Sequence, residues 1–389
     1  MTRNICIFSD GTGQAGGDNP INWTNVYRLY KHTRDADPAR QVCFYDPGLG
    51  AHPDGEKPGL ARRALNILSQ ATGYGITTNI IDCYTALLLS YQPGDQVFLF
   101  GFSRGAYTVR SLGGAIGLCG VPPGLPKLSH WGELQRSLEH EVRAIAEEAV
   151  KTVYQERDET KRHAAAAAFR DKHGSQELPP TFVGVWDTVR ALGVKGLNSF
   201  TLGRHSFNNN RLNPRVPYGR QALAIDENRK TFAPELWEED EANPDRIKQV
   251  WFAGVHTDVG GGYGLKMGLS DITLDWMLTE ATAIPKPLIV DPALPASLAP
   301  NPLGKQHDQL KSGWIPFTPG TREAFIPHRP SQQGRPVFHS VPLRFKALAV
   351  PILDEQRPYR PKALEGHPDY GHHYPSGRPS QGNPVGAVR

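Results

Sequence analysis

The sequence predicts an α/β fold with a mainly parallel sheet. Short apolar segments that end in Gly or Asp alternate along the chain with helical patterns, which is typical of strands joined by crossover helices. Continuous apolar runs of this kind are typical of parallel strands buried on both faces. We therefore expect helices on both faces of the sheet.

Five segments are predicted to contain strands. In chain order they are NICIFSDGTG (4–13), QVCFYDPGLG (41–50), DQVFLFGFSRG (95–105), TFVGVWDTV (181–189) and QVWFAGVHTDVGGG (249–262). Helical patterns occupy 24–34, 75–91 and 104–120, and the last of these ends at Gly120 with Pro122 following, a typical helix stop.

Residues 127–173 depart from this rhythm. The segment is charged and Ala-rich, has good helix propensity and shows no strand pattern, so we expect a helical cap inserted over the sheet. An apolar stripe recurs in it at helical spacing, formed by Val142, Ile145, Ala149 and Val153. Such a stripe either packs on the domain or lines an acyl-chain pocket.

The C-terminal part of the chain is rich in Pro. We expect one domain over residues 1–350 and a Pro- and Gly-rich tail over 351–389, an arm without regular structure of its own. The net charge of +4 on 389 residues is mild, and no Lys/Arg run of the kind that nucleic-acid-binding proteins carry is present. We therefore expect no nucleic-acid partner.

The cysteines and the hydropathy pattern bear on the location. Cys6, Cys43, Cys83 and Cys119 are far apart, which indicates reduced and mostly buried thiols. No stretch approaches 18 consecutive apolar residues, and a strand pattern begins too early to leave room for a signal peptide. The expected location is the cytoplasm, and a secretion system that needs no signal peptide remains open to the chain.

The stretch FLFGFSRGAYTVR (98–110) carries the main chemical signal. It places Ser103 between Gly101 and Gly105, at the point where an apolar strand passes into a helix. This is the context of a nucleophile elbow, a strained turn that lifts a serine hydroxyl above the sheet and crowds its neighbours, so that glycines are needed two residues before and after. The alternative is a Gly–Ser turn without a function.

A serine nucleophile needs a base and a group that orients the base. In the order serine, acid, histidine, Asp187 follows the fourth predicted strand, and His256 follows the fifth and precedes a Gly-rich loop. Asp258 is the alternative acid. The backbone N–H groups of Arg104 and of Gly11 or Thr12, in the first strand's SDGTGQ, are the candidates for the oxyanion hole, although a plain Gly-rich turn there is the alternative.

Several longer strings resemble one known family. They are FSDGTGQ, YDPGLG, PGDQVFLFGFSRGAYTVRSLGGAIG, VGVWDTV, ALAIDENRKTFAPELW and WFAGVHTDVGGGY, and they lie in the family's order over roughly residues 4–280. The chain is identified as a member of an uncharacterised α/β-hydrolase domain family that includes the phospholipase effectors of bacterial type VI secretion. The resemblance implies a serine hydrolase with a Ser–Asp–His triad, which falls here on Ser103, Asp187 and His256.

The resemblance also implies a lipid-like ester as substrate. Peripheral contact with a membrane, and secretion machinery or an immunity protein as a partner, stay open, although no sequence feature supports these partners. We expect no cofactor and no metal. Two alternatives remain from the residues themselves. The strand-end carboxylates Asp10, Asp46, Asp187 and Asp258 could hold a divalent metal for phosphoester hydrolysis, with Ser103 or Thr12 as nucleophile or ligand. Otherwise the chain is a binding or scaffold protein that keeps the fold without turnover.

Overall fold

Six parallel strands form one sheet in a computed structural model of the chain. The structure describes residues 2–11, 13–14, 16–17, 19–48, 73–127, 136–189, 210–264, 268–312, 319–322 and 337–374. The strands are β1 (Asn4–Ser9), β2 (Gln41–Asp46), β3 (Gln96–Phe102), β4 (Phe182–Trp186), β5 (Tyr218–Ala224) and β6 (Ile247–Phe252). Their order in the sheet is β2-β1-β3-β4-β5-β6, and every neighbouring pair is parallel. The predicted α/β-hydrolase-like architecture is confirmed.

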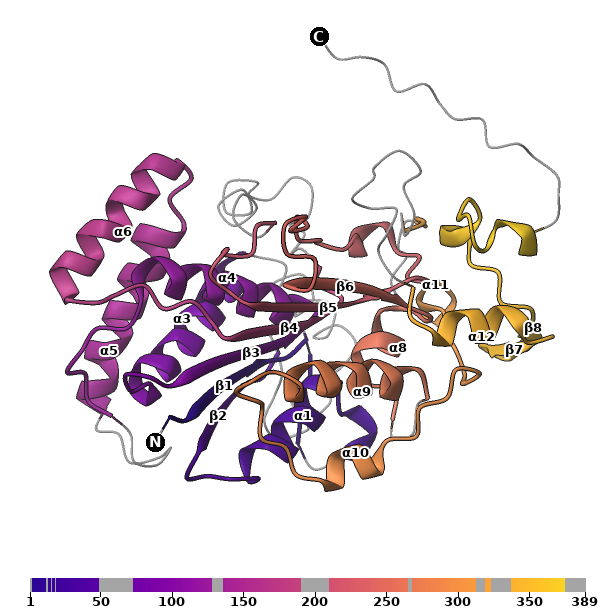
Figure 1. Ribbon diagram of the computed structural model, residues 1–389, viewed down its shortest axis with the longest axis horizontal. Coiled ribbons are helices and arrows are strands. Elements are labelled where there is room, and N and C mark those ends of the chain that lie inside the picture. Colours follow the sequence, from indigo (N-terminus) through magenta and orange to yellow (C-terminus); the bar gives the residue numbers. More distant parts are fainter. Residues whose placement is uncertain are drawn as a thin grey trace, which may run out of the picture.

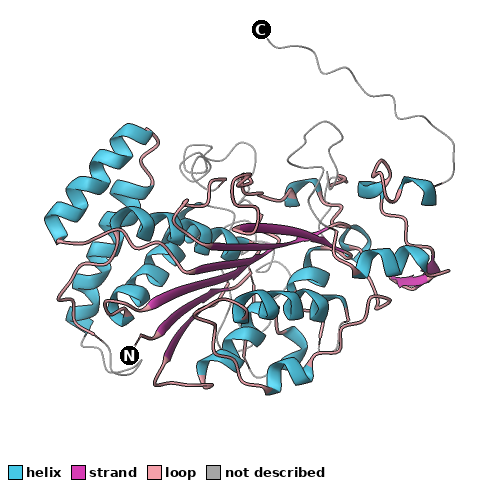
Figure 2. Cartoon of the chain, viewed as in Figure 1, coloured by secondary structure: helices cyan, strands magenta, loops and turns pink. Residues whose placement is uncertain are grey.

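Helices cover both faces of the sheet (Figure 1, Figure 2). On one face lie α3 (Gly73–Ser90), α4 (Arg104–Cys119), α5 (Arg136–Glu148), the π-helical turn η2 (Ala149–Tyr154) and α6 (Glu159–His173). On the other lie α1 (Asn25–Arg34), α9 (Leu269–Thr282) and α10 (Ala293–Ser297). Because side chains alternate along a strand, Ile5 and Leu99 join the core under α4, whereas Phe8 and Phe100 join the core under α1 and α9.

Shorter elements complete the described chain. They are η1 (Pro20–Asn22), η3 (Lys230–Phe232), α8 (His256–Gly260), α11 (Gln309–Ser312), α12 (Ser340–Lys346), β7 (Val350–Ile352), β8 (Glu355–Arg357), η5 (Lys362–Leu364) and η6 (Gly371–His373). Of these, η3 and α8 matter most for the site, because they follow β5 and β6 at the carboxyl edge of the sheet.

Strand β5 was not among the predicted strands. Its sequence, YGRQALA, places Arg220 and Gln221 where a buried strand is expected to be apolar. Both side chains are buried and have polar partners: Arg220 pairs with Glu280, and Gln221 accepts a hydrogen bond from Thr188 Oγ1 at 2.6 Å. Because of these two polar residues, the hydropathy pattern does not indicate a buried strand here.

The predicted helical insertion extends the helical layer of one face. Its stripe residues Val142, Ala149 and Val153 are buried in the same core as α3 and α4, and Ile145 packs against that core. The hydroxyl of Ser175, just after α6, donates to the carbonyl of Cys119 at the C-terminal end of α4. Since α4 has 16 residues and is about 24 Å long, that contact is far from Ser103 at the other end of the helix.

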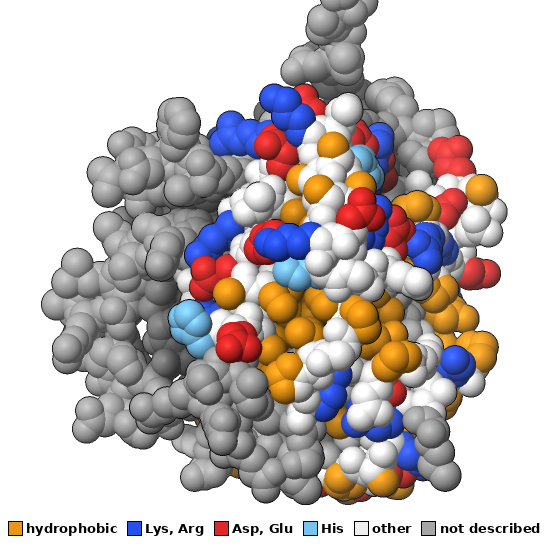
Figure 3. Space-filling model, turned by 90° about the vertical axis from the view of Figure 1, so that its left-hand side faces the viewer, with side chains coloured by type: hydrophobic (Ala, Val, Ile, Leu, Met, Phe, Trp, Pro, Cys, Tyr) orange, Lys and Arg blue, Asp and Glu red, His pale blue; other side chains and the backbone are white. Residues whose placement is uncertain are grey.

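The surface over this end of the molecule carries charges of both signs, interspersed with apolar side chains (Figure 3). Part of this mixture consists of ion pairs: Glu147 on α5 pairs with Arg143 and with Lys151. Among the described residues, no helix has the length and apolar character needed to cross a membrane.

The expectation that the tail lacks regular structure is wrong for residues up to 374. Strands β7 and β8 form an antiparallel pair, and the segment behind them packs against the sheet. Tyr359 and Leu364 are fully buried in a cluster that also holds Trp251 of β6. Aromatic and aliphatic side chains scattered among the prolines supply enough apolar surface to dock the segment. Residues 375–389 lie outside the described chain.

Candidate active site

Ser103 stands on a strained turn between β3 and α4. Its backbone has φ 58° and ψ −118°, a conformation that non-glycine residues rarely adopt and that clusters at functional sites. A Cβ on Gly101 would lie 2.5 Å from the carbonyl oxygen of Gly105, and a Cβ on Gly105 would collide with the carbonyl oxygen of Ser9. The two glycines are therefore required by the close approach of backbone at this turn.

The structure brings Asp187 and His256 together. Asp187 follows β4 directly, and His256 is the first residue of α8, behind β6. His256 Nδ1 lies 2.6 Å from Asp187 Oδ2, and both side chains are buried. Asp187 also has positive φ, at 43°, so it is a second non-glycine residue in a rarely adopted backbone conformation at this edge.

Ser103 shares the sheet edge with this pair. Its backbone N–H donates to the carbonyl of Trp186, the residue before Asp187, at 3.0 Å. The ring of Phe102, the residue before the serine, lies 4.6 Å from the imidazole of His256, measured between centroids. Because the carboxyl ends of parallel strands meet at one edge of the sheet, three residues from distant parts of the sequence come together there.

Arg322 is a site residue that the sequence analysis missed. Its Nη1 donates to Asp187 Oδ1 at 2.6 Å and its Nη2 to Oδ2 at 2.9 Å, so the guanidinium binds the carboxylate with both arms of its fork. The two residues are 135 positions apart. A single arginine in a Pro-rich part of the sequence carries no signal that could have indicated this contact.

Glu227 and Arg229 form a second buried ion pair beside His256. Arg229 donates to both carboxylate oxygens of Glu227, from Nε at 2.7 Å and from Nη2 at 2.8 Å. Glu227 Oε2 accepts the backbone N–H of His256 at 3.2 Å. Both residues come from the loop behind β5, within the string AIDENRK, to which the sequence analysis assigned no role.

The electrostatics favour an ionised Asp187 and a neutral His256. Burial alone would raise the pKa of Asp187, but the charge of Arg322 and the hydrogen bond from His256 outweigh it, so the pKa lies well below its usual range. Burial lowers the pKa of His256, and the bond to Asp187 only partly offsets this. An ionised carboxylate can only accept, so Nδ1 of a neutral His256 carries the proton, and Nε2 has a free lone pair.

The candidate oxyanion donors differ in their surroundings. The backbone N–H of Gly11 donates to Asp10 Oδ1 at 2.7 Å, which engages this donor within its own loop. Thr12 lies outside the described residues. Arg104 opens α4 directly behind Ser103, so its N–H lies at the N-terminus of this helix, where the helix dipole favours negative charge.

Asp258, the alternative acid, is directed elsewhere. It accepts the backbone N–H of Val255 at 3.0 Å, and its other oxygen lies 2.6 Å from His307 Nδ1. The remaining strand-end aspartates also have separate partners: Asp10 accepts from Thr24, and Asp46 accepts from Ser9. Within the described chain, no group of three or more His, Cys, Asp or Glu side chains is arranged to hold a metal ion.

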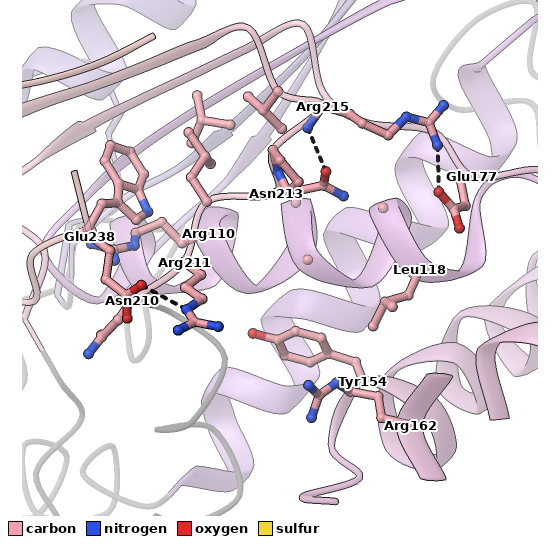
Figure 4. Close-up of a pocket in the computed structure, with 18 of the residues that line it drawn as sticks. Arg110, Leu118, Tyr154, Arg162, Glu177, Asn210, Arg211, Asn213, Arg215 and Glu238 are labelled. Atoms are coloured by element: carbon pink, nitrogen blue, oxygen red, sulfur yellow. Dashed lines mark hydrogen bonds and ion pairs between the residues drawn. The ribbon is translucent and has the colours of Figure 1, made fainter. Parts of the chain in front are cut away.

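Two of the cavities lie against elements that carry site residues, one against α4 and one against the loop behind β5. The larger, of about 860 Å³, lies along the face of α4 and is lined by Gly113, Gly117, Tyr154 and Arg162 (Figure 4), and none of the triad candidates is among its described lining residues. A smaller one, of about 360 Å³, is lined by Arg322 together with Glu227, Arg229 and neighbouring residues. The smaller cavity therefore adjoins the Asp187–His256 pair.

Comparison with known proteins adds the family. An uncharacterized protein of Saccharomyces cerevisiae, YEL023C, is 26% identical over 238 residues, which cover 59% of this chain and 32% of that protein. An uncharacterized protein from Pseudomonas aeruginosa has a similar structure, with a TM-score of 0.44, 16% identity, and coverage of 78% of this chain and 49% of that one. The Tle1 effector bound to the VgrG spike from the type VI secretion system follows, with a TM-score of 0.31, 17% identity, and coverage of 68% and 52%.

The chain thus spans about a third of the length of the yeast protein and about half of each solved structure. A family model described as the catalytic domain of Tle1-like phospholipase effectors of the type VI secretion system matches residues 3–280. Because this match covers more than half of the 389 residues, the chain belongs to the family of Tle1-like phospholipase effector catalytic domains.

Proposed function

We propose that this chain is a serine hydrolase that cleaves carboxylic esters of lipids, with Ser103 as nucleophile, His256 as general base and Asp187 as the residue that orients the base. The observation that carries the proposal is the buried 2.6 Å hydrogen bond between His256 Nδ1 and Asp187 Oδ2, at the same sheet edge as a serine with φ 58°. A strained serine beside a buried Asp–His pair is the constellation that acyl transfer requires.

The reaction proceeds in two halves. His256 Nε2 takes the proton of Ser103 as Oγ attacks the ester carbonyl carbon, and the protonated imidazole then gives that proton to the leaving alcohol as its C–O bond breaks. Water repeats the sequence on the acyl-enzyme, with His256 again as base, and releases the carboxylic acid and free Ser103. Asp187 keeps the proton on Nδ1 throughout and stabilises the imidazolium.

The oxyanion of each tetrahedral intermediate needs two donors. The backbone N–H of Arg104 is one, and the positive end of the α4 dipole adds to it. Since the Gly11 amide already donates to Asp10, Thr12 is the better candidate for the second.

Membership of a phospholipase effector family supports phospholipids as the natural esters, and it supports delivery by a type VI secretion machine, which needs no signal peptide. It equally supports secretion machinery as a partner. The net charge of +4 over 389 residues contributes little to attraction by anionic headgroups once salt screens it, so apolar contact must supply most of the membrane affinity.

The test compares wild type with Ser103→Ala on a short soluble ester and on phospholipid vesicles of rising concentration. We expect wild type to hydrolyse both, with faster turnover once vesicles are present, and to be labelled by a fluorophosphonate at Ser103, while Ser103→Ala does neither. A wild type active only on the soluble ester excludes the phospholipase. Activity that a chelator abolishes indicates a metal-dependent enzyme, and a wild type without activity or labelling is a scaffold.

A further inference from the structure

We propose that Arg322 is a positioning residue for the ester hydrolysis described above: its guanidinium fixes the carboxylate of Asp187 and offsets its charge, so that His256 remains a neutral base down to lower pH than an isolated Asp–His pair allows. The inference rests on the proposed function for its kinetic consequences only. The arrangement of the three side chains can be tested without any substrate.

Arg322 dominates the surroundings of Asp187. The carboxylate receives four hydrogen bonds: two from the guanidinium at 2.6 and 2.9 Å, one from the N–H of Ala224 at 2.9 Å and one from His256. The side chains of Arg322 and Asp187 are 3% and 0% exposed. With both arms of the fork in place, the carboxylate cannot rotate away from the imidazole.

The guanidinium of Arg322 is itself held by η3, in the loop behind β5. Nη2 of Arg322 also donates to the carbonyl of Phe232 in η3, at 2.7 Å. The ring of Phe232 meets the imidazole of His256 edge-on, 5.1 Å away between centroids, and the guanidinium of Arg229 lies 3.5 Å above the same ring. Arg322 therefore connects the acid, the base and the loop behind β5 into one packed unit.

The charges that face His256 sum to zero with Arg322 present. Asp187 and Glu227 are the negative groups, and Arg322 and Arg229 are the positive groups that pair with them. Protonation of His256 would add an uncompensated positive charge to this buried cluster, which is unfavourable. Without Arg322 the cluster has a charge of −1, which favours the imidazolium. His256 then stays protonated up to a higher pH, and in that form it cannot accept the proton of Ser103.

The chain offers a matched control. Arg28 and Asp271 form another buried ion pair with the same closest distance, 2.6 Å, between α1 and α9. The substitution Arg28→Gln removes a buried guanidinium from a buried carboxylate, as Arg322→Gln does, but leaves the Asp187–His256 pair untouched. Arg322→Lys keeps the charge and loses the fork.

The experiment measures the pH profile of kcat/KM and, on substrate-free protein, the NMR titration of His256 in a histidine-labelled sample. For Arg322→Gln we expect the acid limb of the profile and the His256 titration to move to higher pH by about one unit, the size of effect that a neighbouring charge has on a pKa. Arg322→Lys keeps both close to wild type but loses at least about tenfold in kcat, because orientation is lost. Arg28→Gln changes neither.

Because Arg322 lines a cavity of about 360 Å³, added guanidinium at millimolar concentration should partly restore the profile of Arg322→Ala. The inference is overturned if Arg322→Gln loses stability but keeps the wild-type titration of His256, or if Arg28→Gln shifts it equally. If Arg322→Gln does not fold, an Arg322→Lys variant with unchanged kcat overturns it. A wild type that hydrolyses no ester contradicts the proposed function, whereas the NMR titration still decides the role of Arg322.

Discussion

His256 and Asp187 are 69 positions apart in the sequence, and yet their side chains meet at 2.6 Å, whereas Asp258, only two positions from His256, is 2.6 Å from His307 instead. Although Asp258 is close to His256 in the sequence, its side chain turns back to the N-terminal end of α8, where it accepts the backbone N–H of Val255. Asp187 and His256 meet because each follows a strand at the carboxyl edge of the same parallel sheet.

This geometry predicts opposite outcomes for two aspartate substitutions. Asp187→Asn should lower kcat by about 10⁴, because an amide holds the imidazole in the wrong tautomer, and it should also lower stability, because the buried Arg322 loses its carboxylate. Asp258→Asn should retain most activity and lose some stability, since it weakens the bond to His307 and the cap of α8. The measurement is ester hydrolysis together with thermal unfolding. An active Asp187→Asn with an inactive Asp258→Asn would move the acid to Asp258.

The elbow predicts a sharp difference between two glycines. In Gly105→Ala the new methyl group would collide with the carbonyl oxygen of Ser9 in β1, so the turn must shift. We expect a loss of about 2 kcal/mol or more in the free energy of unfolding and no detectable activity, because overpacked backbone has no low-energy rearrangement. Gly366→Ala is the control, since nothing lies within 4 Å of its added methyl group. Equal denaturation midpoints for the two variants would contradict the close packing.

The sequence permitted the elbow and the pairing of strand ends to be predicted because both are local: a strand pattern, a turn motif, and a polar residue where the strand stops. Arg322 could not be predicted in this way, because its contact with Asp187 joins residues 135 positions apart that only the folded chain brings together. Strand β5 was missed for a related reason. Its Arg220 and Gln221 are satisfied by Glu280 and Thr188, partners that only the folded chain brings within reach.

The packing of the C-terminal segment predicts that replacement by alanine will affect stability differently at two leucines 16 positions apart. Leu364 is fully buried in the cluster that also holds Trp251, whereas Leu348 is 95% exposed. Leu364→Ala should reduce the free energy of unfolding by about 2–5 kcal/mol, the range for a buried leucine, and Leu348→Ala should stay within about 0.5 kcal/mol of wild type. Urea denaturation measures both. If Leu364→Ala is as stable as Leu348→Ala, the segment does not contribute to the folded domain.

Asp46, at the end of β2, predicts how stability depends on pH. Burial raises the pKa of Asp46 by more than the hydrogen bonds from Ser9 and Asn79 lower it, so the pKa lies at about 7. In the unfolded chain an aspartate has a pKa of about 3.9, so between about pH 4 and pH 7 the folded protein holds a proton that the unfolded chain has released. The contribution of Asp46 to stability is therefore complete below pH 4 and is lost as the pH rises through 7. Asp46→Asn cannot titrate, so its Tm should fall less than that of wild type between pH 4 and pH 8. Parallel Tm curves for the two proteins would show that Asp46 is ionised in the folded state throughout this range.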